Sequence, residues 1–284
     1  MANARYGCQL PQETADFNRL VEVAGECERL GYDSIWVYDH LSPFWVPSGQ
    51  SLECWTLLSA LAERTEKIKL GSLVTNVNLR NPALLAKMSS TVDNISGGRL
   101  ILGLGTSDRL SREEITSYGY KFSSLEDRVL QLRETIMILK AMWTEDKPSF
   151  DGKFHRIHQA VNFPKPKQKP HPPIWIGGKH HKILDIVAEI AEGWNYWGLS
   201  SQDAAERSRY LSARCTEMGR NVEGITKSWA GNIPEISQRH ATDQIKKTLK
   251  RHFELGTRYF IASLGPRADP TSYRLFAEAV RNLE

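Results

Sequence analysis

Acidic and basic residues stand at the ends of apolar runs, where they could carry chemistry. Asp39 and His40 end the run "SIWVYDH", and Asp108 ends the stretch "GLGTSD". An imidazole titrates near neutrality and exchanges protons, and a nearby carboxylate can fix its tautomer or bind a ring N–H of a ligand. These residues predict acid/base chemistry. A helix-capping Asp39 beside a packed His40 is the structural alternative.

The stretch "GLGTSD" at 103–108 also suggests a place for a flat ligand. A dinucleotide fingerprint would need a third glycine where Asp108 stands, and the residues after it form a polar loop. Gly105, Thr106 and Ser107 are small, however, and would let a ring approach the backbone. An ordinary glycine-rich turn is the alternative.

A second glycine-rich stretch, "WIGGKHHKIL", predicts a phosphate site. Gly177 and Gly178 end an apolar run just before a helical pattern, so backbone N–H groups and the helix N-terminus could hold a phosphate, with Lys179 adding a charge. A plain turn with a glycine cap is the alternative. The neighbouring His180 and His181 lack further ligands at one-turn spacing and do not predict a metal site.

Apolar runs typical of strands recur along the whole chain and must position these residues. They cover residues 4–10, 34–40, 68–75, 99–106, 173–178, 193–198, 226–232 and 258–265. Several are continuously apolar, which is typical of a parallel sheet buried on both faces. Helical periodicities lie between them, one after a possible cap at Thr14 and another after the capping-box pattern of Ser123 and Glu126.

Eight alternating strands and helices in one chain predict a single (β/α)8 barrel domain, a TIM barrel, over residues 1–284. A doubly wound open sheet is the alternative. Two insertions interrupt the alternation: a polar loop at 106–122, after the fourth strand, and a hairpin with a proline-rich return at 144–172, before the fifth. Because barrels build active sites at the carboxyl ends of their strands, Asp39 and His40 are expected at the mouth.

Composition limits the partners. Lys and Arg number 37 against 33 Asp and Glu, a net charge of +4 that does not argue for nucleic acid. The sequence has no apolar run of the roughly 18 residues that a membrane helix needs and no signal-like N-terminus, so we expect a cytoplasmic protein without a membrane partner. Four widely spaced cysteines predict reduced thiols.

Longer stretches resemble the luciferase-like monooxygenase superfamily, and more closely its branch of oxidoreductases that use the deazaflavin coenzyme F420. The matching stretches are "GYDSIWVYDHL" (31–41), "ERTEKIKLGSLVTNVNLRNPALLAKMSSTVDNISGGRLILGLGTS" (63–107), "FDGKFHRI" (150–157), "KPHPPIWIGG" (169–178) and "AEGWNYWG" (191–198). The last sixty residues match least.

The resemblance implies roles for individual residues. It places a bulge with a non-prolyl cis peptide in "GSLV", pointing to Ser72 and Leu73 behind the central ring of the cofactor. Asp39 would touch the ring system, and His40 would be the acid/base group beside the hydride-transfer carbon. The remaining expected cofactor contacts are Thr75, Gly105, Thr106, Ser107, Gly177, Gly178 and Lys179.

The resemblance also implies a homodimer and bears on the substrate. Asp108 stands where the sugar-phosphate dehydrogenases of this branch have a catalytic glutamate, and it would assist His40. "NYWGLSS" lacks the lysine that those enzymes use for a sugar phosphate. Both departures argue against glucose 6-phosphate as substrate. Substrate contacts are expected from residues 41–53 and 106–122.

Three functions follow from these expectations. The first is an F420-dependent oxidoreductase that transfers a hydride between the cofactor and a small alcohol, carbonyl compound or activated alkene. The second is an FMN-dependent monooxygenase that uses reduced flavin and oxygen. The third is a non-catalytic flavin-binding or scaffold protein, which need not keep acids and imidazoles at its strand ends.

Overall fold

The computed structural model describes residues 4–43, 49–233, 239–265 and 268–283, with the backbone alone described for residues 239–242. In this part of the chain, no helix has both the length and the apolar character needed to cross a membrane.

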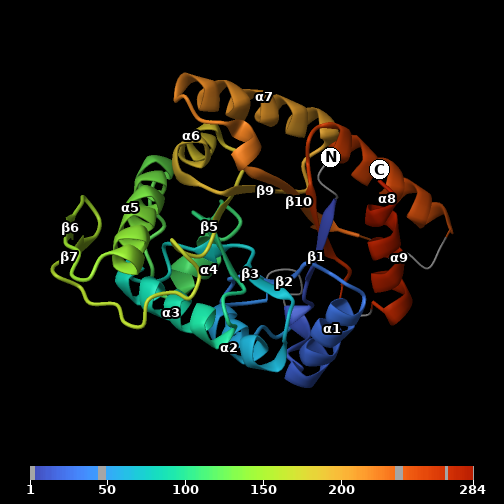
Figure 1. Ribbon diagram of the computed structural model, residues 1–284, viewed down its shortest axis with the longest axis horizontal. Coiled ribbons are helices and arrows are strands. Elements are labelled where there is room, and N and C mark those ends of the chain that lie inside the picture. The colour runs from blue at the N-terminus through green and yellow to red at the C-terminus, as the bar shows by residue number, and fades with distance from the viewer. Residues whose placement is uncertain (1–3, 44–48, 234–238, 266–267, 284) are drawn as a thin grey trace.

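A barrel of parallel strands forms the centre of the molecule (Figure 1). The barrel strands are β1 (Arg5–Gln9), β2 (Ser34–Val37), β3 (Lys69–Ser72), β5 (Leu100–Gly105), β8 (Ile174–Gly177), β9 (Gly193–Trp197), β10 (Thr226–Asn232) and β11 (Tyr259–Ser263). Each pairs in parallel with the next, and β11 pairs with β1 to close the ring. All eight predicted runs supply a barrel strand, which confirms the (β/α)8 barrel and rules out the open sheet.

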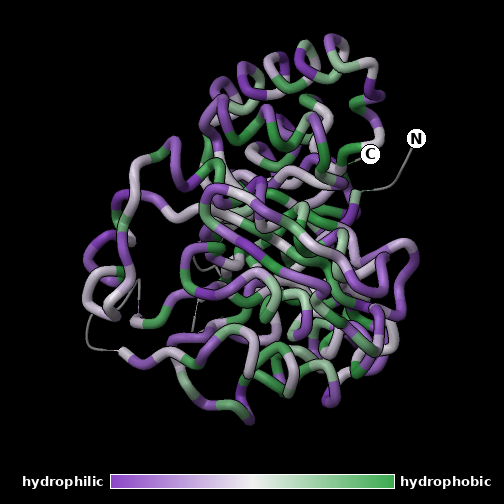
Figure 2. Tube along the Cα trace, turned by 90° about the vertical axis from the view of Figure 1, so that its left-hand side faces the viewer, coloured by the Kyte–Doolittle hydropathy of each residue, from purple (hydrophilic) through white to green (hydrophobic). Residues whose placement is uncertain are grey.

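Helices surround the strands (Figure 1). They are α1 (Phe17–Arg29), α2 (Cys54–Arg64), α3 (Pro82–Ile95), α4 (Arg112–Ser117), α5 (Leu125–Thr144), α6 (His181–Ile190), α7 (Ser201–Glu217), α8 (Arg239–Glu254) and α9 (Pro270–Arg281), with short 3-10 turns at Gln12–Thr14 and Val222–Gly224. Figure 2 shows hydrophobic residues concentrated in the interior and hydrophilic ones on the outer turns.

Two helix starts differ slightly from the prediction. The cap of α1 is Asp16, whose side chain accepts from the Arg19 N–H, rather than Thr14. The cap of α5 is Ser124, one residue after the predicted Ser123, and it accepts from the Asp127 N–H. The apolar periodicity was informative, but several neighbouring polar residues can serve as a cap, so the starting residue is less well determined.

Aromatic side chains fill the interior of the barrel. The indole rings of Trp36 on β2 and Trp175 on β8 lie with their centroids 5.2 Å apart. Both pack over glycines of neighbouring strands: a Cβ at Gly71 would lie 2.1 Å from Trp36, and one at Gly193 would lie 2.4 Å from Trp175. Leu73 packs against this cluster and lines the cavity described below, so the cluster forms a floor.

The third strand is interrupted. The peptide bond between Leu73 and Val74 is cis, and the short β4 (Thr75–Asn76) continues the strand beyond it, paired with β5. The resemblance points to Ser72 and Leu73 for this feature, whereas the cis bond lies one residue later.

Both predicted insertions are present. The 144–172 segment carries an antiparallel hairpin of β6 (Phe150–Asp151) and β7 (Arg156–Ile157), which projects beyond α5 in Figure 1. The carboxylate of Glu134 on α5 fixes this hairpin by accepting from the backbone N–H groups of Lys153, Phe154 and His155. The 106–122 segment, predicted as a polar loop, contains the short helix α4, which is anchored by its buried Ile115.

Candidate active site at the carboxyl ends of the strands

A cavity of about 830 Å³ lies at the carboxyl ends of the barrel strands, a volume in the usual range for small-molecule sites. It is lined by the ends of β1, β4, β5, β8 and β9, by the residues that follow β2, β3, β5 and β8, and by residues of α5 and α6. Of the predicted site residues, those that line it are Asp39, His40, Leu73, Gly105, Thr106, Ser107, Asp108, Gly177, Gly178 and Lys179. The fold therefore brings together residues up to 140 positions apart in the chain.

Ser72 and Thr75 lie outside this lining. Ser72 is buried, and its hydroxyl donates to the Gly103 carbonyl and accepts from the Gly103 N–H. Thr75 is also fully buried, and its Oγ1 has no hydrogen-bond partner among the described residues. Ser72 thus links β3 to β5 behind the cavity. A direct cofactor contact from either hydroxyl would require rearrangement.

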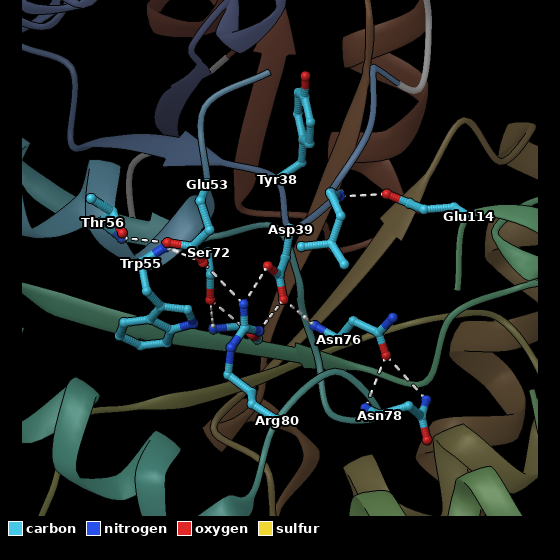
Figure 3. Close-up of polar contacts among 12 residues, drawn as sticks. Tyr38, Asp39, Glu53, Trp55, Thr56, Ser72, Asn76, Asn78, Arg80 and Glu114 are labelled. Carbon is cyan, nitrogen blue, oxygen red and sulfur yellow. Dashed lines mark hydrogen bonds and ion pairs between the residues drawn. The ribbon is translucent and has the colours of Figure 1, made fainter. Parts of the chain in front are cut away.

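The carboxylate of Asp39 is held in a buried ion pair (Figure 3). It accepts from both terminal nitrogens of Arg80, with a distance of 2.9 Å from Nη2 to Oδ1, and from the Asn76 N–H at 2.8 Å. Arg80 also donates to Glu53 at 3.0 Å, and Glu53 caps α2. Burial would lower the pKa of Arg80, but its bond to Asp39 raises the pKa overall. The Asp39 carboxylate thus has a structural role, because its hydrogen bonds hold the chain at the end of β2.

His40 points to a different partner, Glu114 of α4. Its Nδ1 lies 2.7 Å from Oε2 of Glu114, and the side chains are 23% and 8% exposed. Burial alone would raise the pKa of Glu114, but hydrogen bonds from His40 and from the Ser42 and Leu41 N–H groups lower it overall. Glu114 is therefore a carboxylate near neutral pH, and the imidazole has a charged hydrogen-bond acceptor.

Asp108, the predicted second acid, lines the cavity but also caps a turn. Its Oδ1 accepts from the N–H groups of Leu110 at 2.9 Å and Ser111 at 3.2 Å. Asp108 is exposed, so it is positioned by the turn rather than by burial.

The glycines that line the cavity lack a side chain for different structural reasons. A Cβ at Gly105 would lie 2.5 Å from the Val74 side chain, and one at Gly177 would lie 2.9 Å from it, so Val74 occupies the space that both residues leave. Gly178 has a φ of 139°, a conformation that other residues rarely adopt. No side chain projects from Gly177 or Gly178 toward the cavity, while the Gly178 N–H donates to the Asn195 carbonyl and its carbonyl accepts from the Trp194 indole.

The two histidines after Gly178 have separate contacts. The Nδ1 of His180 caps α6 by accepting from the Lys182 N–H at 3.2 Å. The His181 ring stacks on Tyr210, with centroids 4.2 Å apart. The two imidazoles have separate structural roles, and Lys179 and His180 line the cavity while His181 faces α7.

Three residues of the lining each carry a buried polar atom without a partner in the described part of the chain. Gln9 Oε1, Ser107 Oγ and Arg128 Nε have no hydrogen-bond partner among the described residues. Ser107 has a φ of 65°, uncommon for a residue with a side chain, and its carbonyl accepts from Arg128 at 3.1 Å. Buried polar groups are normally paired, so a polar ligand would satisfy atoms that this protein leaves unsatisfied.

Sequence reasoning did not identify Gln9, Glu114 and Arg128 as site residues. Gln9 ends β1 and could have been identified by the same rule as His40. Glu114 and Arg128 lie on helices, and nothing in their local sequence indicates which strand end they face. Of the predicted substrate loops, 106–122 contributes to the lining, while residues 44–48 of the other loop lie outside the described residues.

Comparisons with known proteins agree with this architecture. The family model described as luciferase-like monooxygenase matches residues 1–249. An F420-dependent glucose-6-phosphate dehydrogenase of Amycolatopsis mediterranei is 34% identical over 176 residues, covering 62% of this chain and 52% of that protein. This chain spans about half the length of the curated relatives that it matches.

Solved structures resemble the whole chain. An F420-dependent secondary alcohol dehydrogenase, solved with an F420-acetone adduct, superposes with a TM-score of 0.86 at 17% identity and covers 99% of this chain and 100% of its own. The F420-dependent tetrahydromethanopterin reductase of Methanopyrus kandleri superposes with a TM-score of 0.82 at 16% identity, covering 98% of each chain. Such identities show a common fold. With the family model matching most of its length, the chain belongs to the luciferase-like monooxygenase family.

Proposed function

We propose that the protein is an F420-dependent oxidoreductase acting on a small alcohol, carbonyl compound or activated alkene. The observation that carries the proposal is the combination of His40, hydrogen-bonded to a carboxylate, with a side-chain-free turn at Gly177 and Gly178 in one cavity. The names of the relatives support the same cofactor, since the dehydrogenase and both solved enzymes are F420-dependent.

The residues present fit a deazaflavin with a phosphorylated side chain. The turn of Gly177, Gly178 and Lys179 would hold the phosphate beside the N-terminus of α6, with the Lys179 side chain as a nearby cation. The Gly178 N–H donates to the Asn195 carbonyl and would not be one of the phosphate donors. Leu73 would support the ring, and the unpaired Ser107 Oγ would gain a partner. Bound F420 would accept or deliver a hydride at its C5 carbon. Asp39 would act through its backbone and through the shape of the β2 end, because Arg80 occupies its carboxylate.

His40 would move the proton that accompanies the hydride. When an alcohol is oxidised, its imidazole would take up the hydroxyl proton, and it would return that proton when a carbonyl is reduced. Asp108, whose Oδ1 is engaged by the turn, would contribute charge at the rim. Glucose 6-phosphate remains disfavoured by the missing lysine after β9, so the substrate proposal is an uncharged molecule.

A binding titration tests the cofactor. Purified protein is titrated with F420 and separately with FMN, followed by cofactor fluorescence, with gel filtration to test the expected homodimer. Tight F420 binding with weak FMN binding supports the proposal and justifies an anaerobic screen of alcohols and unsaturated carbonyls. The reverse preference favours a monooxygenase supplied with reduced flavin, and binding of neither contradicts both.

Substitution tests the role of His40. We expect His40→Ala to leave the F420 affinity within a few-fold and to lower turnover by about 10²-fold or more, because it removes the proton-transfer group. The matched control is His158→Ala, which removes an exposed imidazole after the β6–β7 hairpin. Turnover equal to that of the control would remove His40 from the catalytic role.

A further inference from the structure

One carboxylate joins the proposed acid/base residue to the insertion after β5. The Oε2 of Glu114 lies 2.7 Å from His40 Nδ1, while its Oε1 accepts from the Leu41 N–H and, at 3.0 Å, from the Ser42 N–H. Figure 3 shows Glu114 approaching the chain after Asp39 from the side opposite to Arg80. The two carboxylate oxygens of Glu114 thus accept hydrogen bonds from three consecutive residues, His40, Leu41 and Ser42.

We propose that Glu114 is a positioning residue that holds the neutral His40 ring in the tautomer with its proton on Nδ1. Proton exchange with a ligand in the cavity would then go through Nε2. This inference rests on the proposed function, in which His40 carries the proton. It adds the residue that decides which nitrogen does so.

The chemistry of the pair supports this assignment. A carboxylate accepts hydrogen bonds and cannot donate one, so a contact of 2.7 Å with Nδ1 requires the proton on that nitrogen. The neutral form of a histidine has one proton, and a strong acceptor at Nδ1 fixes the other nitrogen as the acceptor of the ring. The Glu114 side chain is only 8% exposed, so water competes weakly for it.

Among the described residues, the other charged side chains near the imidazole have contacts of their own. The Tyr38 ring lies 5.5 Å from it, centroid to centroid, and Tyr38 in turn interacts with Glu13. The Asp39 carboxylate pairs with Arg80, and Asp108 caps its own turn across the cavity. Glu114, by contrast, is a charged group with a direct hydrogen bond to the ring.

A second contact holds the helix in place for this purpose. Tyr118, just after α4, donates its hydroxyl proton to the Leu41 carbonyl at 2.8 Å. Ile115 anchors the same helix by burial. Helix α4 is thus fastened to the chain that leaves β2 through both Glu114 and Tyr118, which keeps the carboxylate oriented toward the ring.

Nuclear magnetic resonance of the full-length protein tests the inference directly. Protein labelled with ¹⁵N-histidine is recorded at increasing pH until the ring ¹⁵N shifts stop changing, and His40→Gln identifies the His40 signals by their loss. The ¹⁵N shifts report which ring nitrogen is protonated. The variants are Glu114→Met, which keeps the length but removes the acceptor, and Glu113→Gln, which neutralises an exposed carboxylate on the same helix as a matched control.

We expect the proton on Nδ1 in the wild type and in Glu113→Gln, and on Nε2 in Glu114→Met. A wild-type ring protonated on Nε2 would overturn the inference even if Glu114→Met fails to fold, and so would an Nδ1 proton that persists in Glu114→Met. Titration of the same wild-type sample with F420 separates the two levels: absence of binding refutes the proposed function, whereas binding with the wrong tautomer refutes only the role of Glu114.

Discussion

Replacing Asp39 with asparagine tests whether its carboxylate has a structural role. Asp39→Asn keeps the shape of the side chain but removes the negative charge between Arg80 and the Asn76 N–H. The side chains of Asp39 and Arg80 are only 1% and 10% exposed. The substitution therefore leaves a largely buried guanidinium facing an amide, which can place an N–H group where an acceptor is needed.

The expected loss follows from this burial. Removing one partner of a buried ion pair costs about 3 to 5 kcal/mol, because the remaining charge is left uncompensated. Glu53 keeps its bond to Arg80 at 3.0 Å, so the lower end, about 3 kcal/mol, is expected. Unfolding entropies of about 2 cal/mol/K per residue imply that this loss lowers the Tm of a chain of this size by about 5 °C.

Thermal and urea unfolding measure the effect. The control is Asp151→Asn in the β6–β7 hairpin, where the pair with Arg156 is 70% and 74% exposed and should contribute about 0 to 1 kcal/mol. The reasoning is refuted if Asp39→Asn and Asp151→Asn lower the Tm equally. A loss confined to Asp39→Asn, with F420 affinity reduced only modestly, would agree with a carboxylate that shapes the site from behind.

Three further predictions concern stability and cofactor binding. Burial lowers the pKa of His252 to about 4, so its contribution to the free energy of unfolding is present above about pH 6.5 and is lost as the pH falls toward 4. In urea unfolding, His252→Asn should reduce this loss of stability at acid pH by about 2 kcal/mol after allowance for screening. An unchanged dependence of stability on pH would contradict this. Glu134→Ala should cost about 2 kcal/mol and speed proteolysis within the β6–β7 hairpin, because three backbone N–H groups lose their acceptor; cleavage at the wild-type rate would argue against it. Gly178→Ala should weaken F420 binding by about tenfold or more, because the φ of 139° is unfavourable for alanine and the new Cβ would lie 3.2 Å from the Ile183 side chain. The control is Gly25→Ala, whose new Cβ would meet no atom within 4 Å and which should bind F420 as the wild type does.

The barrel could be predicted from the sequence because its determinants are local. A parallel strand covered on both faces must be apolar over four to six residues, and a covering helix must be apolar on one side, so each element carries its own pattern. Residues 34–37 and 100–105, for example, are buried at every position. Because active sites of barrels lie at the carboxyl ends of the strands, the sequence predicts that His40, Thr106 and Gly177 share one site, and all three line the cavity.

The partners of those residues were decided by tertiary structure. Arg80 is 41 positions from Asp39, and Glu114 is 74 positions from His40. The local periodicity around Arg80 and Glu114 does not indicate which residue either one contacts. Each lies in a segment whose position over the barrel depends on the neighbouring loops. The sequence therefore indicated most of the predicted side chains at the mouth of the barrel, though not Gln9 or Arg128, and the closed barrel with its insertions decided which charge each one faces.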